Sequence, residues 1–288
     1  MKKNLKAIGI AFAWFAVFMG IQFLVSLAGI MFILAELVHS QGLALFKDQV
    51  LFQQVYMEAL LQNMTWLVLI SNLVTIGGIW IFFLCRRKKF FREIGLRKTS
   101  MRNLSMSVIF GVGICFFVDM LTTYLPFPES VMDQFQSQHG MLWYGDVGLT
   151  FLSVAIVGPI SEEICFRGLC YSGLKKTMRP WAAGLISSVF FGLAHGDPIW
   201  FFVGFLAGVA LSWVYETTGS LLPAIVVHVT NNAISSLTAY VAFPVLLHRI
   251  LLFGSIPIFL FAGFLLHRWN HRPVEIPEAL PEENPFSE

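Results

Sequence analysis

The chain has 288 residues, of which 57% are hydrophobic and only 12% are charged, and its formal net charge is +2. Average soluble proteins are about 45–50% apolar and about 25% charged. The 29 Phe residues and the mean hydropathy of +0.73 leave too little polar surface to cover a water-soluble globule of this size. The composition therefore excludes a soluble enzyme, a disordered chain and a nucleic-acid-binding protein, and it indicates an all-α, polytopic membrane protein.

Apolar segments recur along the chain, and a bilayer core of about 30 Å needs roughly 20 residues of helix. We predict eight transmembrane helices, which cover residues 7–35, 64–85, 104–125, 147–174, 181–195, 199–215, 221–243 and 250–266. Only Gly196, Asp197 and Pro198 separate the fifth from the sixth. Gly158-Pro159 interrupts the fourth, and this break fits a hydrated pocket, because carbonyls freed by a proline are tolerated where they line a water cavity.

The segments outside these helices leave little room for a second domain. Residues 39–63 have mixed polarity and predict an interfacial helix. Residues 126–146 contain no Lys or Arg and predict an external loop. Residues 273–288 are acidic and rich in proline, which predicts a disordered cytoplasmic tail. Residues 1–272 are therefore expected to form a single membrane-embedded domain.

Basic residues predict the orientation, because cytoplasmic loops carry an excess of Lys and Arg. All but three of the 19 Lys and Arg residues fall on one side of the eight predicted helices, together with both termini. The exceptions are Lys47 and Arg249 on the other side and Arg167 within the fourth helix. We therefore expect both termini to be cytoplasmic.

A few polar side chains lie at membrane depth, where an ionisable group costs roughly 2.5–3.5 kcal/mol. They are Asp119, Glu162, Glu163, Arg167, His195, His228, Asn231 and Asn232. Each is a candidate functional residue for that reason. Asp119 lies near the outer end of the third predicted helix and is interpreted as an end-of-helix residue.

Helical spacing separates the roles of these residues. Glu163 and Arg167 stand at i and i+4 and are expected to form an ion pair. Glu162 is rotated by about 100° from Glu163 and is left as the unpaired carboxylate. His228 and Asn232 also share one helical face. We expect the carboxylate, both histidines and Asn232 to meet in one polar cavity. Asn231, about 100° around the helix, is expected to tolerate alanine far better than Asn232.

These residues form three ordered motifs: Glu162-Glu163-x-x-x-Arg167, Phe191-x-x-x-His195 and His228-x-x-x-Asn232. They resemble the motifs of the CAAX protease and bacteriocin-processing (CPBP) family, over residues 149–238. Residues 93–97 are similar to a weaker feature of that family.

The resemblance implies an intramembrane endopeptidase similar to type II CAAX prenyl proteases, with a site open toward the cytosol or the membrane. By motif position, Glu162 and His195 would activate a water. His228 and Asn232 would stabilise the oxyanion, with Glu163, Arg167 and Phe191 in support. The implied substrate is a peptide or a membrane-anchored protein in a bacterial cell membrane, processed in CAAX-type cleavage, in bacteriocin maturation or in self-immunity.

Other nucleophiles are weaker candidates. Ser161, Ser187 and Ser188 are possible by sequence alone, and Ser161 is better interpreted as a helix cap after Pro159. The cysteines lack an activating base at a known spacing and are interpreted as buried thiols. They are Cys85, Cys115, Cys165 and Cys170. A water activated by a carboxylate is the simpler interpretation.

Zinc is the competing mechanism, since Glu162, His195 and His228 would supply the two-histidine, one-carboxylate set of a catalytic site. The chain has no H-E-x-x-H helix, and we favour catalysis without a metal or another cofactor. Two other classes of function stay open. One is a non-enzymatic immunity or peptide-binding membrane protein. The other is an ion- or proton-coupled transporter, against which the absence of inverted repeats counts.

Overall fold

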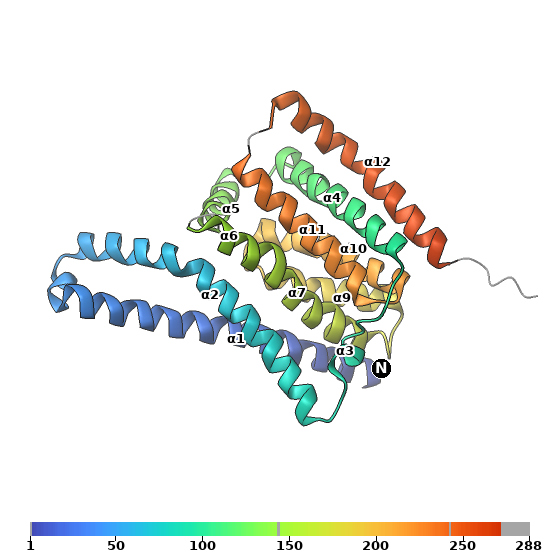
Figure 1. The fold of residues 1–288 in the computed structure, drawn as a ribbon, viewed down its shortest axis with the longest axis horizontal. Helices are drawn as coiled ribbons and strands as arrows, with labels where there is room; N and C mark the ends of the chain where they lie inside the picture. Colours follow the sequence, from blue (N-terminus) through green and yellow to red (C-terminus); the bar gives the residue numbers. More distant parts are fainter. Residues whose placement is uncertain (1, 143–144, 242, 272–288) are drawn as a thin grey trace, which may run out of the picture.

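A computed structural model describes residues 2–142, 145–241 and 243–271 of the chain. Over these ranges the chain is all-helical (Figure 1). The main helices are α1 (Lys2–Gln41), α2 (Gln49–Cys85), α4 (Met101–Tyr124), α9 (Pro180–Leu193), α10 (Pro198–Thr218), α11 (Leu221–Tyr240) and α12 (Val245–Asn270). The short α3 (Phe90–Glu93) and the helix α5 (Glu129–Leu142) flank α4. The predicted tail, residues 273–288, lies outside the described residues.

One continuous helical segment, which we call the motif helix, carries the first sequence motif. It runs through α6 (Val147–Thr150), a first π-helix (Phe151–Val157), α7 (Gly158–Glu163), a second π-helix (Ile164–Tyr171) and α8 (Ser172–Leu174). The expected interruption at Gly158-Pro159 is therefore not a break in the chain's helical path. Proline is tolerated because it occupies the first turn of α7, where the wider π-helical turn before it changes the hydrogen-bond register.

Seven of the described helices are long and apolar enough to cross a membrane, so the prediction of eight is wrong in its count. The fifth predicted span corresponds to α9, which has 14 residues and is about 21 Å long. The chain turns after Ala194 because Gly196 adopts a φ of 72°. Asp197 then accepts hydrogen bonds from the backbone N–H groups of Ile199 and Trp200, and these bonds start α10.

The first two helices are longer than predicted, with 40 residues in α1 and 37 in α2. Residues 39–63 do not form a separate interfacial helix. They complete α1 and α2, which are joined by a short 3₁₀ helix (Leu43–Lys47) into a hairpin that projects from the rest of the molecule (Figure 1). Ile33, Leu37 and Leu45 form a small core inside this hairpin, and apolar residues of α2 pack against it. Packing of the hairpin against itself explains why the polar residues of this segment do not end the helices.

The remaining helices form a bundle in which α4 packs between α11 and α12, and α9 packs against α10. Several of their ends meet at one end of the molecule. There Asn103 of α4 and Asn270 of α12 exchange side-chain hydrogen bonds, and Leu221 of α11 donates to the carbonyl of Gly95. The start of α1 lies at the same end, toward the right of Figure 1. We call it the basic end, because among the described residues all Lys and Arg except Lys47, Arg167 and Arg249 flank it.

The segment predicted as an external loop contains α5. Its sequence is polar, which is why it was interpreted as a loop, but it packs against α10 and α2. It lies at the end of the bundle away from the basic end (Figure 1).

Candidate active site

The three motifs line one cavity of about 720 Å³ inside the bundle. Glu162 reaches it from α7, Phe191 from α9 and His228 from α11. His195, just after α9, and Asn232 of α11 line the same cavity. The volume is in the range of about 300–1,000 Å³ that is usual for ligand sites. The geometry thus brings together residues separated by up to 70 positions in the sequence.

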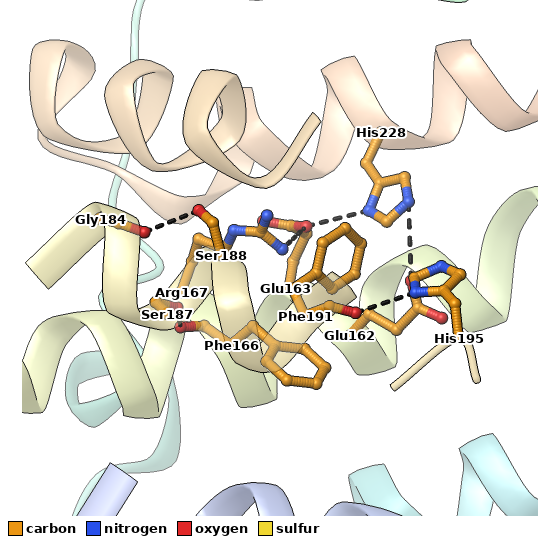
Figure 2. A network of polar contacts seen from close by, with 10 residues as sticks. All are labelled: Glu162, Glu163, Phe166, Arg167, Gly184, Ser187, Ser188, Phe191, His195 and His228. Atoms are coloured by element: carbon orange, nitrogen blue, oxygen red, sulfur yellow. Dashed lines mark hydrogen bonds and ion pairs between the residues drawn. The ribbon is translucent and has the colours of Figure 1, made fainter. Parts of the chain in front are cut away.

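Glu163 is the centre of a fully buried polar network (Figure 2). Its Oε1 accepts a hydrogen bond from Arg167 Nη1 at 2.8 Å, which is the ion pair expected from the spacing. The same oxygen lies 2.9 Å from His228 Nδ1. An ionised carboxylate only accepts hydrogen bonds, so Nδ1 carries the proton and Nε2 is turned away from Glu163. A single carboxylate therefore fixes both the arginine and one histidine.

Phe191 holds the other side of this network. The guanidinium of Arg167 lies 4.2 Å from the centre of its ring, a cation–π arrangement. The ring also makes edge contacts with His195 at 5.0 Å and with His228 at 5.6 Å between ring centres. Phe191 is thus a positioning residue that touches the arginine and both histidines.

Glu162 differs from its neighbour in exposure and in partners. Its side chain is 24% exposed, whereas that of Glu163 is fully buried. Its Oε2 lies 3.6 Å from His228 Nε2, which is too long for a direct hydrogen bond. Of the two adjacent carboxylates, Glu162 is the one that faces the cavity, and His228 is the histidine next to it.

His195 is oriented by its own helix. Its Nδ1 lies 2.9 Å from the carbonyl oxygen of Phe191, which can only accept, so Nδ1 again carries the proton (Figure 2). In the neutral ring Nε2 is then an acceptor. Gly204 leaves room for the imidazole, because a Cβ atom there would lie 3.3 Å from Nδ1. Both histidines are therefore held through Nδ1, which leaves Nε2 for other contacts.

Asn232 is held by the irregular part of the motif helix. In the first π-helix the N–H of Gly158 donates to the carbonyl of Ser153, five residues earlier. The next carbonyl in this register, that of Val154, would need the N–H of Pro159, which proline lacks. Asn232 Nδ2 donates to it at 3.0 Å instead. The proline thus creates the acceptor that orients Asn232.

Asn231, which was expected to tolerate alanine far better than Asn232, lies beside Asn232 at the cavity. Asn231 Nδ2 donates to Asn232 Oδ1 at 2.9 Å, and the residue lines the cavity. The pitch of α11 separates the two side chains, but amide groups are long enough to meet across adjacent positions.

None of the three candidate serines lines the cavity. Ser187 donates to the carbonyl of Phe166 and Ser188 to that of Gly184, and both are fully buried (Figure 2). Ser161 is not a helix cap, because the helix does not restart after Pro159. It is fully buried and its hydroxyl has no hydrogen-bond partner among the described residues.

Two cysteines connect the helical segment of residues 147–174 to α1, and a third, Cys115, lines the cavity. Cys165 and Cys170 are buried and donate to the carbonyls of Trp14 and Ala11. Cys115 is buried as expected, whereas Cys85 is exposed because it is the last residue of α2.

The arrangement of donor side chains gives the zinc alternative no support. Within the described ranges, no group of three His, Cys, Asp or Glu side chains is placed to hold a metal ion. Glu162, His195 and His228 line the same cavity, and the Nδ1 contacts of the two histidines neither require nor exclude a metal at Nε2. The geometry favours no metal ligand set here.

The cavity has polar residues that the sequence did not indicate. Asn72 of α2 lines it, and its Oδ1 is buried with no hydrogen-bond partner in the described part of the chain. Its signal was an asparagine in an otherwise apolar helix. Asp119, which the sequence did indicate and which was interpreted as an end-of-helix residue, also lines the cavity, and its Oδ2 lies 2.8 Å from His248 Nε2 of α12.

The cavity extends from the motif residues away from the basic end. At its far end it is lined by Thr122 of α4, Thr238 of α11, and Phe135 and Gln136 of α5. The resemblance implied a site open toward the cytosol or the membrane. The lining residues extend the cavity toward the side of the bundle that carries α5.

Comparison with known proteins gives a family match for the part of the chain that carries the three motifs. Residues 145–234 match the family model described as type II CAAX prenyl endopeptidase Rce1-like. The chain carries a domain of this family. The Rce1-like domain begins before α6 and ends within α11, so it contains all three motifs. No solved structure matches the chain.

Two curated relatives are similar to the chain. It is 27% identical to the UPF0177 protein YxdF of Lactococcus lactis over 148 residues, which cover 49% of this chain and 82% of that protein. It is 35% identical to the putative membrane peptidase YdiL of Bacillus subtilis over 86 residues, which cover 30% of this chain and 35% of that protein. At the level of family, the Rce1-like domain therefore groups this chain with membrane peptidases.

Proposed function

We propose that this chain is an intramembrane endopeptidase that hydrolyses a peptide bond of a membrane-associated substrate, with a water activated by Glu162 and His195. The observation that carries the proposal is the meeting of the three motifs in one cavity, where Glu162 faces the open space while Glu163 is buried in the network behind it. Membership of an endopeptidase family supports the reaction class.

In this mechanism Glu162 takes a proton from a water, and the water oxygen attacks the carbonyl carbon of the substrate. His195 Nε2 accepts a hydrogen bond from the second hydrogen of the water, which stays on the oxygen, and this bond orients the water. The C–N bond then breaks as the proton passes from Glu162 to the leaving nitrogen, which gives a carboxylic acid and an amine. A positioned acid–base group of this kind contributes about 10²–10⁴-fold to the rate.

The oxyanion of the intermediate would be stabilised by His228 and Asn232. With His228 protonated, the two carboxylates, Arg167 and the imidazolium sum to zero charge, which suits a site inside a membrane. His228 Nε2–H can then donate toward the cavity. Asn232 uses one amide hydrogen on Val154 and keeps the second for the oxyanion. Preorganised donors of this kind act at low cost because they do not reorient during the reaction.

The position of the Lys and Arg residues suggests how the protein is oriented in the membrane. We propose that the basic end faces the cytoplasm, with both termini, because short cytoplasmic loops are enriched in Lys and Arg. The route lined by α5 then opens toward the opposite half of the bilayer. The substrate would be a peptide segment that reaches the cavity from that side, in bacteriocin maturation, self-immunity or CAAX-type processing.

The second candidate is a non-enzymatic protein that uses the same cavity to bind a peptide. It is kept because the cavity is large and partly apolar, which suits peptide binding without chemistry. Purified protein in lipid nanodiscs, incubated with a membrane-anchored peptide library, separates the two. Cleavage products that persist with an excess of a strong zinc chelator support the proposed mechanism. Retention of intact peptide without any product would favour the binding protein.

A further inference from the structure

A second cavity, of about 390 Å³, lies at the basic end of the molecule. Its walls come from the start of α1, the end of α2, and the second π-helix with α8. Three lysines line it, Lys3 and Lys6 from α1 and Lys176 from the turn after α8. We call it the lysine groove. It is separate from the active-site cavity, which shares none of its lining residues.

The charge of the lysine groove is not compensated by the protein. All three lysines are exposed, and none of them forms a hydrogen bond or an ion pair with another described residue. Glu93 also lines the groove, but its carboxylate is paired with Lys88 at 3.3 Å. An anion placed among the lysines would therefore meet a net positive site.

Polarity changes with depth along the lysine groove. Ile10 and Trp14 follow Lys6 by one and two turns of α1, so they line the groove about 6 and 12 Å deeper. Phe83 of α2 and Leu169 of the second π-helix complete this apolar part. Ile10 is 49% exposed, which leaves apolar surface uncovered. The site is thus cationic at the end of the bundle and apolar toward the membrane core.

We propose that the lysine groove binds an anionic phospholipid, with the phosphate among Lys3, Lys6 and Lys176 and an acyl chain along Ile10 and Trp14. A phospholipid presents the same order of groups at the same depths, with its phosphate at the membrane surface and its chain below it. Basic pockets between transmembrane helices at the cytoplasmic side are suited to anionic lipid headgroups. A free phosphate would use the lysines but leave the apolar wall uncovered.

A lipid in this groove would join α1 to the helix that carries Glu163 and Arg167. Leu169 and Ser172, on that helix, line one wall of the groove, and α1 forms the other. The two elements already pack against each other, for example through the rings of Phe18 and Phe166 and through the Cys170 thiol on the carbonyl of Ala11 at 3.4 Å, and a lipid would add to this packing. A ligand that binds only the folded chain raises its stability. Anionic lipid should therefore stabilise the protein against heat.

The test uses the full chain in a neutral detergent, with lipid retention read by native mass spectrometry and the unfolding midpoint read by circular dichroism. The groove variant replaces Lys3, Lys6 and Lys176 by Gln. The matched control replaces Lys2, Lys89 and Lys98 by Gln, three exposed lysines at the same end that do not line the groove. Both variants remove the same charge from exposed positions, so both are expected to fold.

Phosphatidylglycerol should bind the wild type and the control and raise their unfolding midpoints, while phosphatidylcholine should not. The groove variant should bind phosphatidylglycerol at least tenfold more weakly. Equal binding by the two variants, or equal stabilisation by phosphatidylcholine, would overturn the proposal. A shift of the same size with soluble glycerol phosphate would also overturn it, because the acyl chain would then contribute nothing.

Discussion

At the scale of single residues, the site depends on how one buried carboxylate is shared. Glu163 accepts hydrogen bonds from both Arg167 and His228 through the same oxygen. Arg167 is itself fully buried, and its guanidinium packs on Phe191. The ion pair could be predicted from the i, i+4 spacing. The bond to His228 could not, because it joins two helices whose relative rotation the sequence does not give.

Replacement of Arg167 by Ala should destabilise the protein. It leaves the buried Glu163 with only a histidine and removes the group that packs on Phe191, and breaking a buried pair costs about 3–5 kcal/mol. The expected result is a lower unfolding midpoint and a lower yield in detergent. Arg179→Ala, at an exposed position, is the matched control and should leave both unchanged. Equal behaviour of the two variants would show that the buried pair does not hold the fold.

Replacement of Asn232 by Ala should lower kcat by about 10²–10³ with little change in KM, because one oxyanion donor is lost. Asn231 is not a suitable control, since it donates to Asn232. Asn103→Ala is a better one, because Asn103 is also a hydrogen-bonded asparagine of a long helix but lies at the basic end. It should lower stability and leave kcat unchanged. A change confined to KM in Asn232→Ala would assign that residue to substrate binding.

At the scale of elements, the strongly apolar helices were predicted well and the irregular ones were not. Hydropathy located α4, α11 and α12 because each is apolar along most of its length, whether its side chains face the bundle or, as for much of α12, point away from it. The two π-helices were missed, since a change of hydrogen-bond register leaves the composition of the segment unchanged. The helix α5 was missed because its polar sequence also fits a loop. The length of α9 depended on the turn at Gly196, which hydropathy does not detect.

The π-helical turn gives an element-scale prediction for Pro159. Pro159→Ala restores an N–H that can donate to the carbonyl of Val154, and this bond would compete with Asn232. We expect an unfolding midpoint that is equal or higher, together with a lower kcat. Pro257→Ala is the matched control, since Pro257 lies inside α12 and does not line the cavity. The same kcat in Pro159→Ala as in the wild type would mean that the proline does not orient Asn232.

At the scale of the whole molecule, seven long apolar helices are consistent with an integral membrane protein, but their number alone would place the termini on opposite sides. The starts of α1 and α4 and the end of α12 nevertheless gather at the basic end (Figure 1). The shorter α9 starts at Pro180, next to Arg179 at this end, and ends at Leu193; α10 then returns from Pro198. Whether the two termini lie on the same side of the membrane therefore depends on whether α9 counts as an additional crossing, and not only on the seven longer helices.

A topology measurement can test this arrangement. A reporter that is active only in the cytosol should be active when fused after Glu288 and inactive when inserted after Pro128, which lies just before α5. Positive charge at the basic end is the physical reason for this orientation. Activity in the opposite pattern would reverse the orientation and place the route to the cavity on the cytoplasmic side.

The central claim is that Glu162 activates the water, and one measurement tests it most directly. Single-turnover cleavage of a membrane-anchored peptide would be compared between the wild type, Glu162→Gln and Glu58→Gln in lipid nanodiscs. Glu58 is an exposed carboxylate of α2 that does not line the cavity. We expect Glu162→Gln to fold and bind the peptide but to lose cleavage by at least about 10²-fold, as for loss of a general base, while Glu58→Gln cleaves like the wild type. Cleavage by Glu162→Gln at the wild-type rate would contradict the mechanism.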